Sequence, residues 1–466
     1  MRARLRGAGR RRGLLTGTAL ALASLLAGCT GASAESTTAN STAAVSFPKK
    51  LTSAAERAAA RAAHGKKPGG SIEIIGVNGG TEGAIIDAAI RPFEKATGIT
   101  VRYQGSADSQ ALIQSRVQAG NPPDLIDAAN AGQMRRYQAE GELQDVGSWL
   151  GEDTLQRDFN SSLLDSSRLD GKVYGVWSEV DNFMVWYNTH RYTGSTHPAS
   201  QASWLRWAKQ RAAAGHTPFC MGLESGSGTG WPGGNVIESL FVKKYGAAKL
   251  RAWSEGRLAW SSPEVRDAWE TFGKISGSSD MVAGGPVNTL VTNLVNYSDG
   301  LFDRPARCEM SIFGTYAAGL ARVAHPDVEP LTDMGFYPVP AASARAAGAE
   351  NVGGHLLSAF TDSPQTRAFA RYWASAEAQS LLASSGQWTV GNKRVPASVY
   401  TDPALAEAAR TLLDPSKQLV AGPSFTSLPG VMDAYDKGIV SYLQDPTPAT
   451  LTTVLAGLDA TTRGAR

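Results

Sequence analysis

From residue 71 onward, short β-rich runs alternate with amphipathic segments, and this alternation limits the folds that the chain can adopt. Residues 71–77 (SIEIIGV) have the composition of a buried strand. Apolar residues then recur at helical spacing up to Gly98, a residue type that commonly ends helices. The expected strands and helices follow one another at 71–77, 82–96, 99–103, 109–119 and 124–128. This order predicts a parallel α/β unit whose ligands bind beyond the carboxyl ends of the strands.

The later part of the chain has a different pattern. Helices are expected around 201–213, 232–245, 262–276 and 287–297, and the region 364–459 is mostly helical. Short strands are expected at 308–314, 334–339 and 355–360. Strands that recur so late predict that the chain crosses back into its first lobe.

The N-terminal segment indicates export. Residues 1–12 are basic, and residues 13–28 are apolar and uncharged. This apolar run is shorter than the roughly 20 residues of a membrane-spanning helix, so we interpret residues 1–28 as a signal peptide. The sequence Leu26-Ala27-Gly28-Cys29 resembles the lipobox of bacterial lipoproteins, which implies that Cys29 carries a diacylglyceryl group. An ordinary secretory signal with a chance cysteine is the alternative.

The residues after Cys29 predict a tethered protein. Residues 30–46 are small and polar, and we expect a flexible tether over 29–70, with at most a marginal surface helix within 51–67. No later uncharged run is long enough to cross a membrane. We therefore expect the body on the extracytoplasmic face of the bacterial cell membrane, held by its lipid. Arg11-Arg12 resembles a twin-arginine export motif, but the sequence does not decide between that route and Sec.

Two cysteines remain after Cys29, namely Cys220 and Cys308. An even number in an oxidising compartment favours a disulfide between them over two buried thiols. In the chain-entropy model, a bridge over a separation of 88 residues contributes on the order of 4 kcal/mol.

The charge balance excludes one class of partner. The formal net charge is +3, but six arginines lie before residue 29, and their removal leaves 39 basic against 42 acidic side chains. A mature chain of this kind lacks the basic surface that nucleic-acid binding requires.

Motifs for cofactors and nucleophiles are missing. No Gly-Lys pair continues as a phosphate-binding loop, and the glycines over 76–83 have the wrong spacing for a dinucleotide fingerprint. The six histidines lack metal-ligand spacing, and Ser225 and Ser227 lack the frame of a nucleophile elbow. We expect no cofactor, no metal and no catalytic residue.

Two carboxylates and a set of aromatic residues remain as candidates. Glu179 and Asp181 alternate on an expected strand, so both point to one face about 7 Å apart. Such a pair could serve a glycoside hydrolase or bind sugar hydroxyls. Aromatic residues in turns or at strand ends suit stacking on sugar rings, and they are Trp177, Trp186, Trp231, Tyr316, Trp388 and Tyr435. The alternative for each is a place in the core.

Residues 169–188 (LDGKVYGVWSEVDNFMVWYN) resemble the extracellular solute-binding proteins of carbohydrate ABC importers, the maltose-binding-protein-like family. The resemblance extends over about 71–445 and includes 120–143 and 311–319. Residues 218–238 (PFCMGLESGSGTGWPGGNVIE) are similar to the α-glucoside-binding branch.

The resemblance implies an α/β, two-lobed periplasmic-binding-protein-like fold with a ligand cleft between the lobes. It implies lobe one at 71–178 and 309–360, and lobe two at 179–308 and 361–460. The disulfide would then lie within lobe two. The implied ligand-binding residues are Glu82, Asn130, Trp177, Asp181, Trp231, Tyr316, Gly354, Trp388 and Tyr435. Asn130 is a departure, because the family usually has Asp near this position.

The resemblance also implies a non-enzymatic function. A monomeric lipoprotein would capture a sugar, such as an α-glucoside or another oligosaccharide, and deliver it to the permease subunits of an importer and their ATPase. The alternatives are a secreted lipoprotein glycoside hydrolase and a binding protein for peptides or other polar solutes.

Cys29→Ser tests the anchor. Without the thiol no thioether to a lipid can form, so we expect unprocessed or unlipidated protein in a metabolic lipid-labelling experiment. A variant that still carries a lipid and stays in the membrane fraction would refute the anchor.

Overall fold

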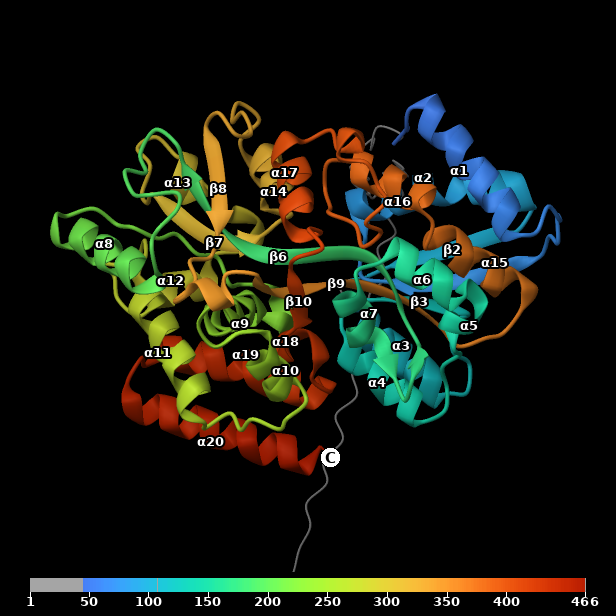
Figure 1. The fold of residues 1–466 in the computed structure, drawn as a ribbon. Helices are drawn as coiled ribbons and strands as arrows, with labels where there is room; N and C mark the ends of the chain where they lie inside the picture. Colours follow the sequence, from blue (N-terminus) through green and yellow to red (C-terminus); the bar gives the residue numbers. More distant parts are fainter. Residues whose placement is uncertain (1–44, 107, 466) are drawn as a thin grey trace, which may run out of the picture. The chain divides into compact units, whose positions relative to one another are not determined.

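Strands and helices alternate through residues 45–106 and 108–465, the part of the chain that the computed structural model describes (Figure 1). The predicted signal peptide, Cys29 and the first part of the predicted tether lie outside these residues. The strands are β1 (Ser71–Gly76), β2 (Thr100–Gly105), β3 (Leu125–Ala128), β4 (Arg168–Leu169), β5 (Lys172–Val173), β6 (Val176–Asn188), β7 (Met310–Gly314), β8 (Met334–Pro338), β9 (Ala349–Ala359) and β10 (Gln418–Ala421).

The α-helices of the first half of the chain lie mostly between these strands. They are α1 (Lys49–Ala62), α2 (Gly80–Thr97), α3 (Ser109–Gln118), α4 (Ala131–Ala139), α5 (Val146–Leu150), α6 (Glu152–Asp158), α7 (Ser161–Ser167), α8 (Gln201–Ala213), α9 (Trp231–Tyr245) and α10 (Ala247–Ser254). The remaining α-helices are α11 (Pro263–Ser276), α12 (Gly285–Val291), α13 (Asp299–Phe302), α14 (Ala317–Ala324), α15 (Pro364–Trp373), α16 (Ala376–Ser384), α17 (Pro403–Leu412), α18 (Pro423–Thr426), α19 (Pro429–Gln444) and α20 (Pro448–Gly464).

The expected parallel α/β unit is confirmed. β1 pairs in parallel with β2 on one side and with β3 on the other, and α2 and α3 connect the strands. Helix α2 ends at Gly98, whose φ of 70° lies in the left-handed region that favours glycine. The carboxyl ends of β1 and β3 therefore lie at one edge of the sheet, where ligands bind in such folds.

Two long strands connect this unit to the rest of the protein. β6 and β9 pair in antiparallel fashion, and the strand order is β2-β1-β3-β9-β6-β7, with β10 beside β9 and β8 beside β6. The first part of β6 pairs with β9, and its second part pairs with β7 and β8. Figure 1 shows β6 and β9 running across the middle of the view. One sheet therefore passes through both halves of the fold.

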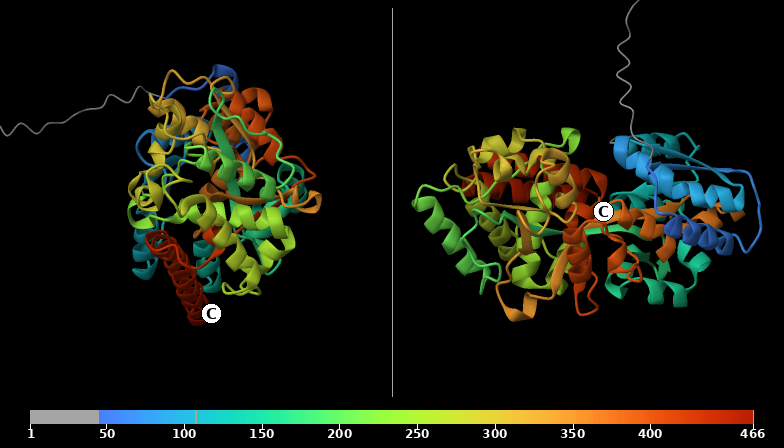
Figure 2. Two further views of the ribbon diagram at one scale, coloured as in Figure 1. Left: turned by 90° about the vertical axis from the view of Figure 1, so that its left-hand side faces the viewer. Right: turned by 90° about the horizontal axis from the view of Figure 1, so that it is seen from above.

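The buried apolar residues form three clusters along this sheet. The first core packs β1–β3 against α1–α7 and α15–α17. The second core packs the second part of β6 with β7 against α8–α11, α19 and α20. The third core surrounds the two cysteines and α14. Helix α20 lies along α11 and α19 (Figures 1 and 2).

The packing differs from the expected lobe boundaries in two segments. Residues 310–339 belong to the second and third cores, although the sequence suggested the first lobe. Helices α15 to α17 belong to the first core, although the sequence suggested the second lobe. Of the three late strands, only β9 pairs with a strand of the first α/β unit, and that strand is β3. Periodicity identified the strands but could not show which partners they pair with.

The expected tether over 29–70 is wrong for its last part. Helix α1 lies within that range and packs against α2, α15 and α16. Its alanines Ala55, Ala58, Ala59 and Ala62 are buried in the first core. Small side chains let helices approach closely, so the alanine-rich segment is part of the core.

The expected disulfide is present in the structure. Cys220 and Cys308 are joined, with their Cα atoms 5.7 Å apart. Gly300 packs directly against the bridge, because a Cβ there would lie 2.1 Å from the Sγ atom of Cys220. The bridge ties the loop before α9 to the loop before β7 within the third core. Among the described residues, no helix has the length and apolar character needed to cross a membrane.

Replacing both cysteines by alanine should lower the free energy of unfolding by roughly 4 kcal/mol, because the 88-residue separation is then unconstrained in the unfolded chain. Chemical denaturation under non-reducing conditions measures this loss. Reduction of the wild-type protein should cause a similar loss and serves as the control. Free alkylation of both thiols in the unreduced, unfolded protein would contradict the bridge.

Candidate functional site

Four carboxylates and one imidazole meet where β6 crosses from the first core to the second. We call this group the acidic cluster, and its members are Glu82, Asp127, Glu179, Asp181 and His355. Every other member of the cluster acts electrostatically on the carboxyl group of Glu179. The sequence predicted Glu82 and Asp181 as ligand-binding residues, and the structure brings them together.

Each member lies on a strand or in the first turn of a helix. Glu179 and Asp181 lie on β6, opposite His355 and Gly353 of β9. Asp127 lies near the end of β3, and Glu82 lies in the first turn of α2, which follows β1. The cluster thus forms at the edge of the sheet that the α/β unit predicts.

A glycine on β9 makes this arrangement possible. Gly354 has a φ of 132°, and a Cβ there would lie 2.3 Å from the backbone oxygen of Glu179. The β6–β9 register shifts between Trp177 and Glu179 at the same place. Gly354 was predicted to bind ligand, but its role here is to let the two backbones approach closely.

His355 lies between two carboxylates. Its Nδ1 atom is 3.3 Å from Oδ2 of Asp127 and 3.5 Å from Oε2 of Glu179. The hydroxyl of Ser178 donates to Oδ1 of Asp127 at 3.1 Å and so fixes that carboxylate. Burial lowers the pKa of His355, but Glu179, Asp127 and Asp181 outweigh burial and raise the pKa to about 10. His355 is therefore a cation at neutral pH.

The carboxyl groups resist ionisation because they are buried together. Burial raises the pKa of Glu179 to about 8, against the effect of His355 and with further contributions from Asp181 and Glu82. Burial raises the pKa of Asp181 to about 6, although His355 opposes it. Burial also raises the pKa of Glu82, and His355 again acts in the opposite direction. Such shifts cluster at functional sites.

A row of aromatic rings leads from the acidic cluster into the second core. Tyr316 packs edge-on against Phe313 at 5.5 Å between ring centroids, and Phe313 lies 5.9 Å from Phe183. Phe183 in turn packs edge-on against Trp231 at 6.4 Å. Tyr316 and Trp231, both predicted ligand-binding residues, are partly exposed. Burial, together with the charges of Asp181 and Glu179, raises the pKa of Tyr316.

The prediction that Trp177 and Tyr435 stack on a ligand is wrong in this structure. Trp177 is 0 % exposed, stacks on Phe425 at 5.1 Å, and donates its indole N–H to the oxygen of Leu163. Tyr435 is 0 % exposed and packs among the tryptophans of the second core. Trp186 is buried as well. Ring faces that are covered by protein cannot contact a sugar.

Two further predicted residues are buried near the site. Asn130 caps α4 by accepting a hydrogen bond from the backbone N–H of Gln133, and its amide lies 3.4 Å from the oxygen of Ser424. Trp388 is buried and lines a cavity beside Glu179 and His355. Asn130 therefore caps helix α4. Trp388 lines the same small cavity as Glu179 and His355 of the acidic cluster.

The sequence analysis did not assign three polar residues of this site. Asp127 and Asn78 are buried polar residues at strand ends, and His355 follows the assigned Gly354. The signal for Asp127 was a carboxylate inside an otherwise apolar strand. His355 gave no signal of its own, because its two carboxylate partners come from distant parts of the chain.

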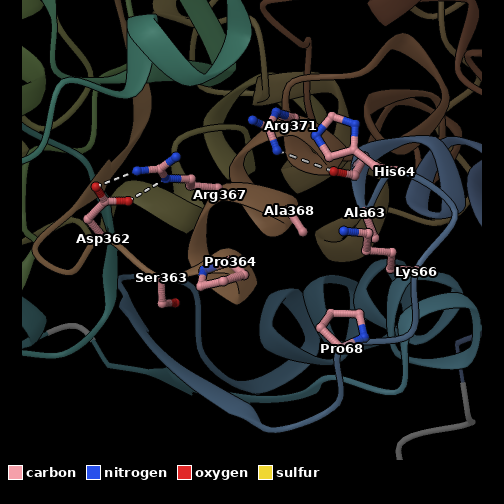
Figure 3. A pocket seen from close by; sticks show the side chains of 11 residues that line it. Ala63, His64, Lys66, Pro68, Asp362, Ser363, Pro364, Arg367, Ala368 and Arg371 are labelled. Atoms are coloured by element: carbon pink, nitrogen blue, oxygen red, sulfur yellow. Dashed lines mark hydrogen bonds and ion pairs between the residues drawn. The ribbon is translucent and has the colours of Figure 1, made fainter.

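Two cavities differ in their relation to the acidic cluster. A cavity of about 10 Å³, with room for about one water molecule, lies among Asp127, Glu179, His355 and Trp388. A larger cavity of about 400 Å³ lies between the end of α1 and α15 (Figure 3). Its arginines already have partners, because Arg367 pairs with Asp362 and Arg371 donates to the oxygen of Ala62. The acidic cluster combines four carboxyl groups with a single imidazole, and we therefore take it as the candidate functional site.

Metal binding finds no support in the geometry. In residues 45–106 and 108–465, no group of three or more His, Cys, Asp or Glu side chains is arranged to hold a metal ion. Two carboxylates of the acidic cluster, those of Asp127 and Glu179, contact the imidazole of His355.

Comparison with known proteins identifies the family. The family model of bacterial extracellular solute-binding proteins matches residues 78–380. This match covers more than half of the chain, so the chain belongs to the bacterial extracellular solute-binding proteins. The resemblance found in the sequence is confirmed.

Two curated relatives and one solved structure illustrate the likeness. The osmoprotective compounds-binding protein GgtB of Synechocystis sp. is 26 % identical over 377 residues, which are 80 % of this chain and 88 % of that protein. The alpha-glucosides-binding periplasmic protein AglE of Rhizobium meliloti is 25 % identical over 362 residues, 74 % of this chain and 77 % of that protein. The bacterial solute receptor AcbH, which prefers b-D-galactopyranose, matches with a TM-score of 0.69 at 17 % identity, over 85 % of this chain and 99 % of that one. The α/β, two-lobed binding-protein fold is therefore confirmed.

The acidic cluster should make stability depend on pH. An ordinary glutamate has a pKa of 4.5, and that of folded Glu179 is about 8. The unfolded chain therefore loses this proton first, and the stabilising effect of the protonated group, complete below about pH 4.5, disappears as the pH rises through 8. His355 acts in the same direction between its ordinary pKa of 6.5 and about 10.

Glu179→Gln should reduce this loss, because the glutamine side chain does not titrate. One proton corresponds to about 1.4 kcal/mol per pH unit in the free energy of unfolding. Chemical denaturation at pH 5, 7 and 9 measures the slope for both proteins, and Glu142→Gln at an exposed position is the matched control. Equal slopes for Glu179→Gln and wild type would contradict the assignment.

Proposed function

We propose that the protein is a membrane-anchored substrate-binding lipoprotein that captures a sugar and delivers it to an ABC importer. One observation carries the proposal. Partly exposed carboxylates and aromatic rings come from both halves of the fold, and strand β6, which carries Asp181, passes between these halves. Family membership supports transport, and the names of AglE and AcbH support carbohydrate. The name of GgtB supports a small polar osmoprotectant, which the same chemistry could hold.

Two kinds of contact would hold the sugar. Glu82 and Asp181 are partly exposed, and neither has a hydrogen bond or ion pair among the described residues. Their oxygens can accept hydrogen bonds from sugar hydroxyls. Tyr316 and Trp231 offer partly exposed rings, and sugar C–H faces stack on such rings. A ligand that contacts residues of both lobes would favour their closure.

The geometry favours binding over hydrolysis. Retaining and inverting glycosidases need two carboxyl groups that both reach the scissile bond. Glu179 is only 8 % exposed and is held 3.5 Å from His355, so it is not free to approach a substrate. Of the two carboxylates on β6, Glu179 and Asp181, only Asp181 is partly exposed, so the pair cannot act on one glycosidic bond.

We also propose a revised division into lobes, based on the cores. Lobe one would comprise residues 45–180 and 352–425, and lobe two would comprise 183–339 and 431–458. Helix α1 would then begin lobe one, and the lipid on Cys29 would hold that lobe near the membrane. The closed form would present both lobes to the permease subunits, and the protein would act as a monomer.

Three substitutions test the sugar site. Asp181→Asn keeps the shape of the side chain and removes its charge, and charge-assisted hydrogen bonds are worth about 1.5–3 kcal/mol. We expect affinity for the bound sugar to fall roughly tenfold to a hundredfold. Tyr316→Ala and Trp231→Ala each remove a ring and should cost on the order of 1 kcal/mol or more. Asp153→Asn, on exposed α6, is the control.

A thermal-shift screen of sugars identifies the ligand, and calorimetry then measures the affinities. A sugar at 100 times its dissociation constant should stabilise the protein by about 2.7 kcal/mol. The sugar should also stay intact during long incubation. Unchanged affinity in all three variants would show that the site is misplaced, and hydrolysis products that Asp181→Asn cannot make would favour a glycosidase.

A further inference from the structure

The carboxyl groups of the acidic cluster outnumber its cationic side chains. His355 is the one cation that acts on Glu82, Glu179 or Asp181 within the residues that the structure describes. In the described part of the chain, no lysine or arginine forms an ion pair or a hydrogen bond with these three carboxyl groups, and Glu179 has only His355 as an ion-pair partner. Buried charges are normally paired, so a site with four acidic side chains and one cationic partner is unusual.

His355 is already committed to two of the four carboxylates. It lies 3.3 Å from Asp127 and 3.5 Å from Glu179, on the inner side of the cluster. Glu82 and Asp181 have neither an ion pair nor a hydrogen bond among the described residues, and they are the members toward solvent. The amide groups at the start of α2 favour a negative charge on Glu82 but cannot neutralise it.

A second observation points to a ligand at the same place. The hydroxyl of Tyr316 is buried and has no hydrogen-bond partner among residues 45–106 and 108–465. Burial raises the pKa of Tyr316, and the charges of Asp181 and Glu179 raise it further, so these two carboxyl groups act electrostatically on the hydroxyl. The ring of Tyr316 lies against Gly314, where a Cβ would be 2.2 Å from the ring. An aromatic ring fixed beside carboxylates is the arrangement that attracts a cationic nitrogen.

Neutral sugars and metal ions satisfy this site less well. Sugar hydroxyls donate hydrogen bonds to carboxylates but leave their charge in place. A metal ion would need a converging set of ligands, and no such set of three or more exists in the described part of the chain. A protonated amine supplies both the hydrogen bonds and the missing positive charge.

We propose that the ligand is a sugar derivative with a basic nitrogen, whose ammonium group lies between Asp181 and Glu82 and beside the ring of Tyr316. This inference rests on the proposed function, since it names the class of sugar that the same site takes. The sugar rings would extend from there toward Trp231.

Matched pairs of ligands test the inference. The probes are neutral disaccharides that differ in linkage, each compared with derivatives in which one hydroxyl is replaced by a primary amine. Calorimetry at pH 7 gives the ratio of affinities within each pair. We expect at least one amine to bind about tenfold or more tightly than its parent. Asp181→Asn and Glu82→Gln should each bring that ratio close to one, whereas Asp153→Asn should leave it unchanged.

The outcomes separate this inference from the proposed function. If parents bind and no amine binds more tightly, the inference is wrong and the sugar-binding function stands. If neither parents nor amines bind, the proposed function fails, and the inference fails with it. An amine preference that survives in both Asp181→Asn and Glu82→Gln would also overturn the inference, because the preference would then come from another part of the site.

Discussion

The antiparallel pairing of β6 with β9 is the constraint on which the rest of this structure depends. These strands are the link by which one sheet passes through both halves of the fold, from β3 on one side to β7 and β8 on the other. Their pairing places Glu179 opposite His355 and Asp181 opposite Gly353. A slip of one residue would turn every one of these side chains to the other face of the sheet. The site therefore depends on the register of one strand pair.

Two groups of charged side chains lie along the paired strands β6 and β9, and they differ in the number of cationic partners that their carboxylates have. Near the start of β9, Glu350 accepts from Lys243 at 2.6 Å, from Asn182 at 3.2 Å and from Lys417 at 3.4 Å. This network joins β6, α9, β10 and β9, and its charges are paired. The acidic cluster, further along the same strands, has a single imidazole for four carboxylates. Perturbed carboxyl groups cluster at functional sites, and the acidic cluster is therefore the group that we propose as the binding site.

Local patterns in the sequence were sufficient for much of the fold. The alternation of residues 71–128 predicted the β1–α2–β2–α3–β3 order, because strand and helix periodicities depend on neighbouring residues alone. The two remaining cysteines predicted their own bridge, and the motif around 169–188 indicated the family. Glu82 and Asp181 were predicted as site residues because the family resemblance implies ligand-binding roles for the segments in which they lie.

What the sequence by itself determined is thus the type and order of the elements, the family, and the segments from which the site is drawn. The tertiary structure alone decided which side chains face the ligand. Trp177, Trp231 and Tyr435 look alike in their segments, yet Phe425 and the second core cover two of them and leave Trp231 partly exposed. It also decided the charge of His355, because Asp127 and Glu179 reach it from other strands. Burial and charge are sums over contacts between distant segments, and no single segment contains those contacts.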